Sequence, residues 1–379
     1  MFIQSLHLKD FLSFQDVEIE LGPVNVLIGP NGSGKSNVIN AIDFLRHCPD
    51  DLSSFVLNDG GAEQWIRWAP EVKSASMLVT TYANPLSLNY SLSFRAENRA
   101  PRVESENLNI VFPDGTEFLR TENEFSWGEL QAVVRPSVDP TKLRPFQAFL
   151  SQYRSPSSDH VTQLSEDLER IRIYRSFDTT RGNGLRNGVY TTGAADPRLS
   201  SSGSNLAYAL HELDIQERLS AVNEFLAEFA PHYTGIKPRW VNGAWTLQLR
   251  EAGLDRPTPT ERISDGTLKF LCLLAILLDP APPPLICIDE PEAGLHPDAI
   301  ALVSRAMEDA AERTQLIVTT HSEALVSRFS DRPEAVVVCE KNAENATTLK
   351  RQSRDELKIW LEEFSLGSLW QRGVLGGNR

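Results

Sequence analysis

The feature that most constrains the fold of this chain is a glycine-rich stretch that ends in lysine and serine. Residues 29–36 read Gly-Pro-Asn-Gly-Ser-Gly-Lys-Ser and fit the spacing G-x-x-x-x-G-K-[ST]. Glycines let the backbone turn so that successive N–H groups point at phosphate oxygens, and the following helix directs its positive end at the same anions. Lys35 would supply charge to the β- and γ-phosphates, and Ser36 would give an oxygen to Mg²⁺.

The residues around this stretch predict a strand, a loop and a helix in that order. Val24–Ile28 is a mostly apolar run, typical of a strand buried on both faces. Apolar residues recur at helical spacing from Val38 to Leu45, and Pro49 ends the pattern. A chance match in a glycine turn would lack this context. The residues predicted to bind nucleotide here are Gly29, Pro30, Asn31, Gly32, Ser33, Gly34, Lys35, Ser36 and Asn37.

A second apolar segment ends in two acidic residues. Residues 285–290 read Leu-Ile-Cys-Ile-Asp-Glu, as expected for a strand whose carboxyl end lies at the edge of a parallel sheet. There Asp289 would hold Mg²⁺, directly or through water, and Glu290 would polarise the attacking water as general base. A strand followed by an acidic turn is common, so this interpretation depends on its coupling to the phosphate loop. Asp289 lies 254 positions after Lys35, which predicts a large insertion between two strands of one sheet.

A short polar loop, residues 263–267, reads Ile-Ser-Asp-Gly-Thr and precedes an apolar helix. Such a loop is a second candidate anion site, because the helix dipole favours negative charge there. The alternative is a plain helix N-cap, and these five residues by themselves favour that alternative.

The remainder of the chain predicts an α/β fold with an insertion. Residues 75–120 alternate as in an antiparallel sheet, and residues 145–232 are mainly helical, with a glycine- and serine-rich interruption at 176–204. Asn242-Gly243 between two short apolar runs predicts a hairpin with a type I′ turn. The last third alternates helices and strands, with strands at 315–319 and 335–339 and helices between them.

The expected domains follow from these patterns. Residues 1–150 and 255–379 form one discontinuous α/β nucleotide-binding domain, a mixed sheet with an antiparallel subdomain. Residues 151–254 form a mainly helical insertion lobe, with a β-hairpin near 234–251.

Composition limits the environment and the partners of the protein. The chain has 379 residues and a formal net charge of −14, which argues against a constitutive nucleic-acid coat protein. Its four cysteines show no metal-ligand spacing and predict reduced core thiols. The longest apolar run, residues 270–278, is far shorter than the roughly 20 residues of a membrane span. We therefore expect a cytoplasmic protein without membrane contact.

Four motifs together resemble the ABC-type ATPases of the RecF/SMC/OLD-like group. They are GPNGSGKSN at 29–37, ISDGT at 263–267, ICIDEPEAGLHP at 286–297 and TTHS at 319–322, in the order found in that group. The resemblance covers the whole ATPase core and implies a P-loop NTPase fold that binds ATP and Mg²⁺ and hydrolyses ATP.

The resemblance also implies roles for particular residues. Ser264, Asp265 and Gly266 resemble the signature loop, which contacts the γ-phosphate held by a second subunit, although Asp265 replaces a glycine that transporters have there. Residues 291–297 resemble the loop at the dimer seam, and His321 resembles the switch histidine that bonds the γ-phosphate. His296 has two readings of equal weight, functional or structural. For the glutamine expected as a metal ligand, Gln152 is preferred over Gln147 and Gln131.

Partners are implied in the same way. Residues 204–207 and the end of the chain, residues 365–379, resemble a bacterial group of stand-alone predicted ATPases of about this length. Relatives in that broad group act in DNA repair and phage defence, often beside a nuclease with a TOPRIM-type fold. The resemblance therefore implies an ATP-dependent homodimer with DNA or a TOPRIM-type effector nuclease as partner. A nucleotide-binding scaffold with little hydrolysis and an ABC transporter motor subunit are the alternatives.

Five arginines, Arg170, Arg172, Arg175, Arg181 and Arg186, lie within 17 positions. Contact with DNA phosphates is one use of such a cluster, and a solvated face with scattered acids is the slightly favoured alternative. The acidic residues outside 289–292 show no paired pattern typical of a nuclease, so we expect any DNA cleavage to come from another protein.

Overall fold

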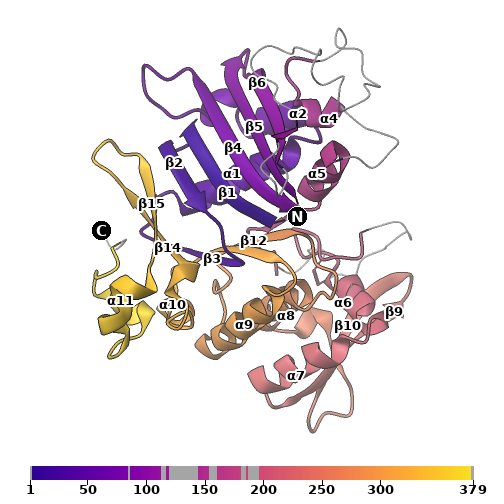
Figure 1. The fold of residues 1–379 in the computed structure, drawn as a ribbon. Helices are drawn as coiled ribbons and strands as arrows, with labels where there is room; N and C mark the ends of the chain where they lie inside the picture. The colour runs from indigo at the N-terminus through magenta and orange to yellow at the C-terminus, as the bar shows by residue number, and fades with distance from the viewer. Residues whose placement is uncertain are drawn as a thin grey trace.

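The computed structural model describes residues 2–83, 86–111, 117–118, 144–152, 160–180, 185–186 and 196–376 (Figure 1). Three sheets organise these residues. In Figure 1 an antiparallel sheet lies above the central strands, and a mainly helical lobe that carries a small sheet lies below them.

The central sheet has six strands in the order β15-β14-β3-β13-β12-β8. All neighbours pair in parallel except β14 and β15. The strands are β3 (Val24–Ile28), β8 (Arg172–Tyr174), β12 (Leu285–Asp289), β13 (Gln315–Thr319), β14 (Val336–Lys341) and β15 (Thr347–Arg351). Because β3, β13 and β12 are parallel neighbours, their carboxyl ends lie at the same edge of the sheet. The phosphate loop follows β3 at this edge, and the acidic pair lies at the end of β12. This confirms that the two motifs belong to one sheet.

The central strands are mostly apolar, as expected for strands that are covered on both faces. Ile317 packs on the side of α1 (Lys35–His47), whereas its neighbours Leu316 and Val318 pack on the side of α8 (Asp265–Leu277) and α9 (Pro297–Ala310). This alternation is the two-residue period of a strand. The sheet therefore holds α1 and α8 on opposite sides.

The second sheet is antiparallel, in the order β2-β1-β4-β5-β6-β7. Its strands are β1 (Phe2–Phe11), β2 (Phe14–Glu20), β4 (Ser74–Ala83), β5 (Leu86–Glu97), β6 (Ala100–Val111) and β7 (Glu117–Phe118). Phe44 of α1 packs against it, with its ring centroid 5.2 Å from that of Phe11 and 5.1 Å from that of Phe94. The helix that follows the phosphate loop is thus held between two sheets. The antiparallel sheet expected at 75–120 is confirmed.

The lobe contains α6 (Leu206–Ile215), α7 (Leu219–Phe229) and a three-stranded sheet of β9 (Tyr233–Val241), β10 (Ala244–Glu251) and β11 (Thr258–Pro259). The expected hairpin is confirmed: Val241 pairs with Ala244, and both turn residues have positive φ, 51° at Asn242 and 84° at Gly243. A type I′ turn requires this conformation at both positions.

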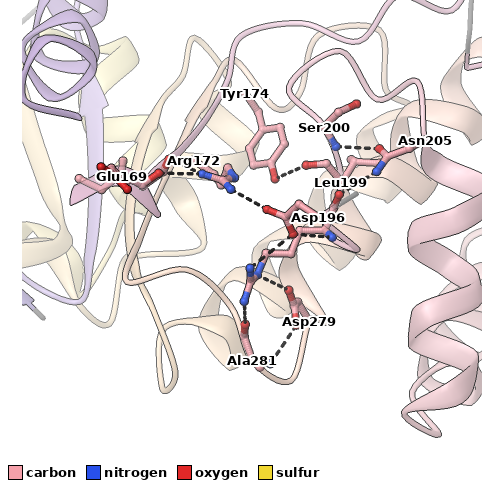
Figure 2. A network of polar contacts seen from close by, with 11 residues as sticks. Glu169, Arg172, Tyr174, Asp196, Leu199, Ser200, Asn205, Asp279 and Ala281 are labelled. Carbon is pink, nitrogen blue, oxygen red and sulfur yellow. Dashed lines mark hydrogen bonds and ion pairs between the residues drawn. The ribbon is translucent and has the colours of Figure 1, made fainter. Parts of the chain in front are cut away.

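A network of polar contacts connects the edge strand β8 to the lobe (Figure 2). Arg172 forms an ion pair with Asp196, at 2.6 Å, and the Tyr174 hydroxyl donates to the Leu199 carbonyl oxygen, at 2.9 Å. Arg198 continues the network to Asp279 and to the Ala281 carbonyl oxygen, beyond the end of α8. The segment before α6 is therefore fixed both to the central sheet and to the loop after α8.

The boundaries of the expected domains stay a prediction, but β8 lies inside the segment expected to be the insertion and is a strand of the central sheet. Three residues are too few to show a periodic pattern in the sequence. The other helices are α2 (Leu52–Asn58), α4 (Phe149–Gln152), α5 (His160–Glu169), α10 (Glu323–Ser327), α11 (Arg354–Leu361) and α12 (Leu366–Gln371). All four cysteines are buried and free. Among the helices of the described residues, none combines the length and the apolar character that crossing a bilayer needs.

Candidate nucleotide-binding site

The phosphate loop connects β3 to α1 and requires glycine at two positions where its backbone lies close to a neighbouring strand. Gly29 has φ 147°, and a Cβ there would lie 2.2 Å from the carbonyl oxygen of Cys339 in β14. Gly34 has φ 105° at the N-cap of α1, and a Cβ there would lie 2.2 Å from Oγ1 of Thr347 in β15. A side chain would collide with a neighbouring strand at either position, so glycine is required for this loop conformation.

Lys35 is buried at the start of α1, and its amino group lies among loop carbonyls. Its Nζ donates to the carbonyl oxygens of Gly29, at 2.7 Å, and Pro30, at 3.0 Å. Burial lowers the pKa of Lys35, and nearby charges that include Asp289 and Glu290 act in the opposite direction. The two sequence motifs are therefore within electrostatic reach of each other, as predicted.

The loop also contains a polar group that fits a phosphate. Ser33 is 1% exposed, and its hydroxyl has no hydrogen-bond partner among the described residues. A buried hydroxyl without a partner is costly, and a phosphate oxygen would supply the missing acceptor. Ser36, the predicted Mg²⁺ ligand, is exposed at the first turn of α1. The loop thus fits the bound nucleotide and metal that the motif predicts.

Thr347 supports the phosphate loop from a strand more than 300 positions away. Its hydroxyl donates to the Ser33 carbonyl oxygen, at 2.8 Å, and shares a hydrogen bond of 2.7 Å with the hydroxyl of Ser13. Ser13 in turn accepts from the Asn37 side chain, at 2.7 Å. Sequence reasoning missed Ser13 and Thr347, because a lone threonine or serine carries no spacing signal.

The acidic pair is oriented by β13. Asp289 pairs in register with Thr319, whose hydroxyl donates to the Asp289 carboxylate. Glu290 has φ 49° and donates its N–H to the Thr319 carbonyl oxygen, at 3.1 Å. This left-handed turn places the Glu290 carboxylate 3.6 Å from Nε2 of His321. The structure therefore brings Asp289, Glu290 and His321 together, and it adds Thr319, which sequence reasoning missed.

Glu292 fixes the backbone that carries His321. One oxygen of its carboxylate accepts from the Thr320 hydroxyl and from the His321 N–H, both at 2.7 Å. The other oxygen, Oε2, is buried and has no hydrogen-bond partner within the part of the chain that the structure describes. Sequence reasoning placed Glu292 in the seam loop and missed this contact with the segment after β13.

The predicted signature loop begins α8. Ser264 is the N-cap, and its hydroxyl accepts from the Thr267 N–H at 3.1 Å. Lys269, one turn further, donates to the Ala293 carbonyl oxygen at 3.2 Å. The loop at 263–267 thus lies beside the loop at 291–297. His296 caps α9 by accepting from the Asp298 N–H at 3.3 Å, which supports its structural reading.

A cavity of about 310 Å³ lies beside the acidic pair, lined among others by Arg175, Phe177, Lys269, Asp289 and Glu290. Arg175 comes directly after β8 in the chain and forms part of the cavity wall. Its guanidinium pairs at 2.9 Å with Asp43 of α1. Arg175 therefore occupies the site-facing end of β8, next to the strand that carries Asp289.

In this structure Gln152 bonds to backbone groups near α4, and its role as a metal ligand stays a prediction. Its amide oxygen accepts from the Arg144 N–H, at 2.7 Å, and its amide nitrogen donates to the carbonyl oxygens of Arg144, Gln147 and Ala148. No contact in the described part of the chain links Gln152 to the phosphate loop or to Asp289. The amide holds the turn before α4, and Gln131 lies outside the described residues.

The clustered arginines agree with the favoured alternative, in which scattered acidic residues accompany them. The four that the structure describes form internal ion pairs: Arg170 with Asp167, Arg172 with Asp196, Arg175 with Asp43 and Arg186 with Asp265. Arg181 lies outside the described residues. Each of these guanidinium groups already has an anionic partner, so the four do not form a free basic surface. Within the described ranges, no group of three or more His, Cys, Asp and Glu side chains is arranged to hold a metal ion.

Comparison with known proteins agrees with this geometry. A family model described as "AAA domain, putative AbiEii toxin, Type IV TA system" matches residues 24–327. A DNA replication and repair protein RecF of Corynebacterium jeikeium is 29% identical over 101 residues, which are 26% of this chain and 22% of that protein. An OLD nuclease of Thermus scotoductus is 37% identical over 43 residues, 11% of this chain and 8% of the nuclease. These alignments span about a quarter or less of each relative's length.

Three comparisons cover nearly the whole chain. An ATP/GTP phosphatase of Helicobacter pylori is 20% identical over 376 residues, 93% of each protein. An Smc head bound to the C-winged helix domain of ScpA has a TM-score of 0.54 at 14% identity, covering 94% of this chain and 99% of that one. An Smc head derived from Pyrococcus furiosus has a TM-score of 0.53 at 14% identity, covering 96% and 99%. The expected α/β fold with an ABC-type ATPase core is therefore confirmed.

Proposed function

Because this chain belongs to the family described as "AAA domain, putative AbiEii toxin, Type IV TA system" and is a RecF/SMC/OLD-like ABC-type ATPase, we propose that it is a dimerising switch that binds and hydrolyses ATP. One observation carries this proposal. The phosphate loop, Asp289, Glu290 and His321 meet at the carboxyl edge of one sheet, with the Glu290 carboxylate 3.6 Å from the His321 ring.

Each group has a role that its surroundings support. The N–H groups of the loop, the Ser33 hydroxyl and Lys35 bind the phosphates, and Lys35 exchanges its carbonyl partners for phosphate oxygens. Ser36 and Asp289 would hold Mg²⁺, which when bound neutralises charge on the phosphates. Glu290 accepts a proton from the attacking water, and His321, fixed through Glu292, donates a hydrogen bond to the γ-phosphate.

The site is proposed to be completed by a second copy of the chain. Ser264 and Asp265 are exposed at the N-terminus of α8, and among the described residues they make no contact with the phosphate loop. The positive N-terminal end of this thirteen-residue helix can bind an anion, and in this proposal the anion is held by the other protomer. In a dimer, this loop would contact the γ-phosphate bound by the partner.

The proposed partners are DNA and an effector nuclease, in DNA repair or phage defence. The printed names of two similar proteins, a DNA replication and repair protein and a nuclease, support this part of the proposal. The outer face of the lobe sheet offers a basic surface. Lys237, Arg239 and Arg250 are exposed there and form no ion pair among the described residues. DNA phosphates would bind this face in a chain that is otherwise strongly acidic.

Light scattering on the Glu290→Gln variant tests the proposal. Loss of the general base should trap ATP, so the variant should form a species of twice the monomer mass with ATP and stay smaller without it. The matched control is Glu290→Gln combined with Lys35→Ala, which should stay monomeric with ATP. A monomer under both conditions at micromolar concentration would refute the dimerising switch. A scaffold without hydrolysis predicts no phosphate release from the wild type in a single-turnover assay.

A further inference from the structure

Arg186 is a buried arginine that connects the segment after β8 to the loop before α8. Its Nε donates to the Thr179 carbonyl oxygen at 2.6 Å. The remaining nitrogens donate to three carbonyl oxygens, of Thr260 at 3.4 Å, Glu261 at 3.1 Å and Ile263 at 2.8 Å, and form an ion pair with the Asp265 carboxylate. The Arg186 side chain is 7% exposed. A planar guanidinium with five N–H donors can satisfy such a set, and lysine cannot.

The negative charge of Asp265 lies at the N-terminus of α8, where the proposed function places a phosphate. Asp265 is the first residue of α8, its side chain is 66% exposed, and it follows the N-cap Ser264. A carboxylate at a helix N-terminus is favourable for the helix itself. The same charge repels a phosphate that approaches the same N–H groups. Arg186 lowers the pKa of Asp265, so Asp265 stays ionised at neutral pH.

We propose that Arg186 is a positioning residue that neutralises Asp265, so that the loop at 263–267 can accept the γ-phosphate bound by a partner protomer. This inference rests on the proposed function. The ion pair turns a repelling carboxylate into a neutral unit, and the three carbonyl contacts hold the loop that carries Ser264. Lys269, one turn further along α8, also acts on Asp265, but through its charge alone, whereas Arg186 and the Thr179 side chain bond the carboxylate directly.

The contact also connects two parts of one protomer. Thr179 belongs to the segment whose residues Ser176 and Phe177 line the cavity beside Asp289 and Glu290. Arg186 therefore connects two sites of one protomer. One is the wall of the cavity beside Asp289 and Glu290, and the other is the loop at 263–267, which would contact the partner's nucleotide.

Four variants of the Glu290→Gln parent separate the charge of Arg186 from its support of the loop. The measured quantity is the ATP-dependent dimer dissociation constant, by analytical ultracentrifugation. Arg186→Gln should weaken the dimer about tenfold, because Asp265 then keeps a charge that no directly bonded cation neutralises. Asp265→Asn should dimerise more tightly than the parent. The double variant should return to within about threefold of the parent. Arg186→Lys keeps the charge but cannot bond all of the carbonyl oxygens, so its dissociation constant should lie between those of Arg186→Gln and the parent.

Arg198→Gln is the matched control, because Arg198 also bonds acids and a carbonyl but at the other end of α8. It should leave the dissociation constant unchanged, and thermal unfolding of every variant shows that it is folded. A double variant as weak as Arg186→Gln would overturn the inference, since a merely structural role gains nothing from Asp265→Asn. A parent that stays monomeric with ATP would contradict the proposed function itself, and with it this inference.

Discussion

Lys35 and Glu290 act on ATP at different steps, so their replacement should affect different quantities. Lys35 neutralises phosphate charge in the ground state, and Lys35→Ala should weaken nucleotide binding. Glu290 acts on the water, and Glu290→Gln should retain ATP binding but lose turnover by roughly 10²–10⁴-fold, the usual worth of a positioned base. Equilibrium binding of a fluorescent ATP analogue and steady-state phosphate release measure the two effects. Wild-type hydrolysis by both variants would contradict the assignment.

At the scale of single residues, the sequence predicts the contiguous motifs but not the long-range contacts that support them. The phosphate loop and the acidic pair are contiguous in the chain, so their chemistry could be predicted from spacing. Gln152 stays a prediction from residue type and position, and in this structure its amide bonds to the backbone of 144–148. Thr319, Glu292 and Thr347 act through strand register and long-range contacts, and Arg186 through a partner 79 positions away. Sequence spacing carries no trace of such contacts.

The short helix α4 is held to the antiparallel sheet by Glu106 of β6. The Glu106 carboxylate accepts from the N–H of Phe149, at 2.6 Å, and from the Tyr90 hydroxyl, at 2.8 Å. Burial raises the pKa of Glu106 to about 7, from 4.5 in an unfolded chain. The folded state therefore holds a proton that the unfolded state releases. Stability from this group is fully present below about pH 4.5 and is lost as the pH rises to about 7.

The variant Glu106→Gln cannot ionise, so its free energy of unfolding should fall less than that of the wild type between those two pH values. The difference should be on the order of 2 kcal/mol. Urea titrations at intervals across the range measure it. Parallel curves for the wild type and the variant would show that Glu106 is not the group that titrates.

The lobe sheet, rather than the arginines before it, is the element expected to contact DNA. Lys237→Glu with Arg239→Glu should weaken DNA binding about tenfold at low salt and reduce its salt dependence, because two phosphate contacts are lost. Fluorescence anisotropy at two salt concentrations, with and without a non-hydrolysable ATP analogue, measures this. Arg354→Glu with Lys358→Glu in α11 makes the same charge change elsewhere and should have little effect. Equal losses in both pairs would indicate general charge repulsion instead of a binding face.

For the whole molecule, the order of strands explains why motifs 254 positions apart form one site. β13 lies between β3 and β12, and the insertion leaves the sheet and returns to it without disturbing that order. Parallel strands buried on both faces gave a clear apolar signal, so the core of the fold could be predicted. β8 could not, because its three residues are defined by pairing with β12 and by the contacts of Arg172 and Tyr174.

The central claim is that each ATP is enclosed by the phosphate loop of one protomer and the Ser264 loop of another. Mixing Lys35→Ala protein with Ser264→Arg protein tests it most directly. Neither variant alone has a complete site, but a mixed dimer has one, formed by the loop of the Ser264→Arg chain and the Ser264 of the Lys35→Ala chain. In an equimolar mixture half of the dimers are mixed, and each mixed dimer has one complete site instead of two. ATP hydrolysis should therefore recover to as much as about a quarter of the wild-type rate per chain. A mixture no more active than the sum of its two components would contradict the account.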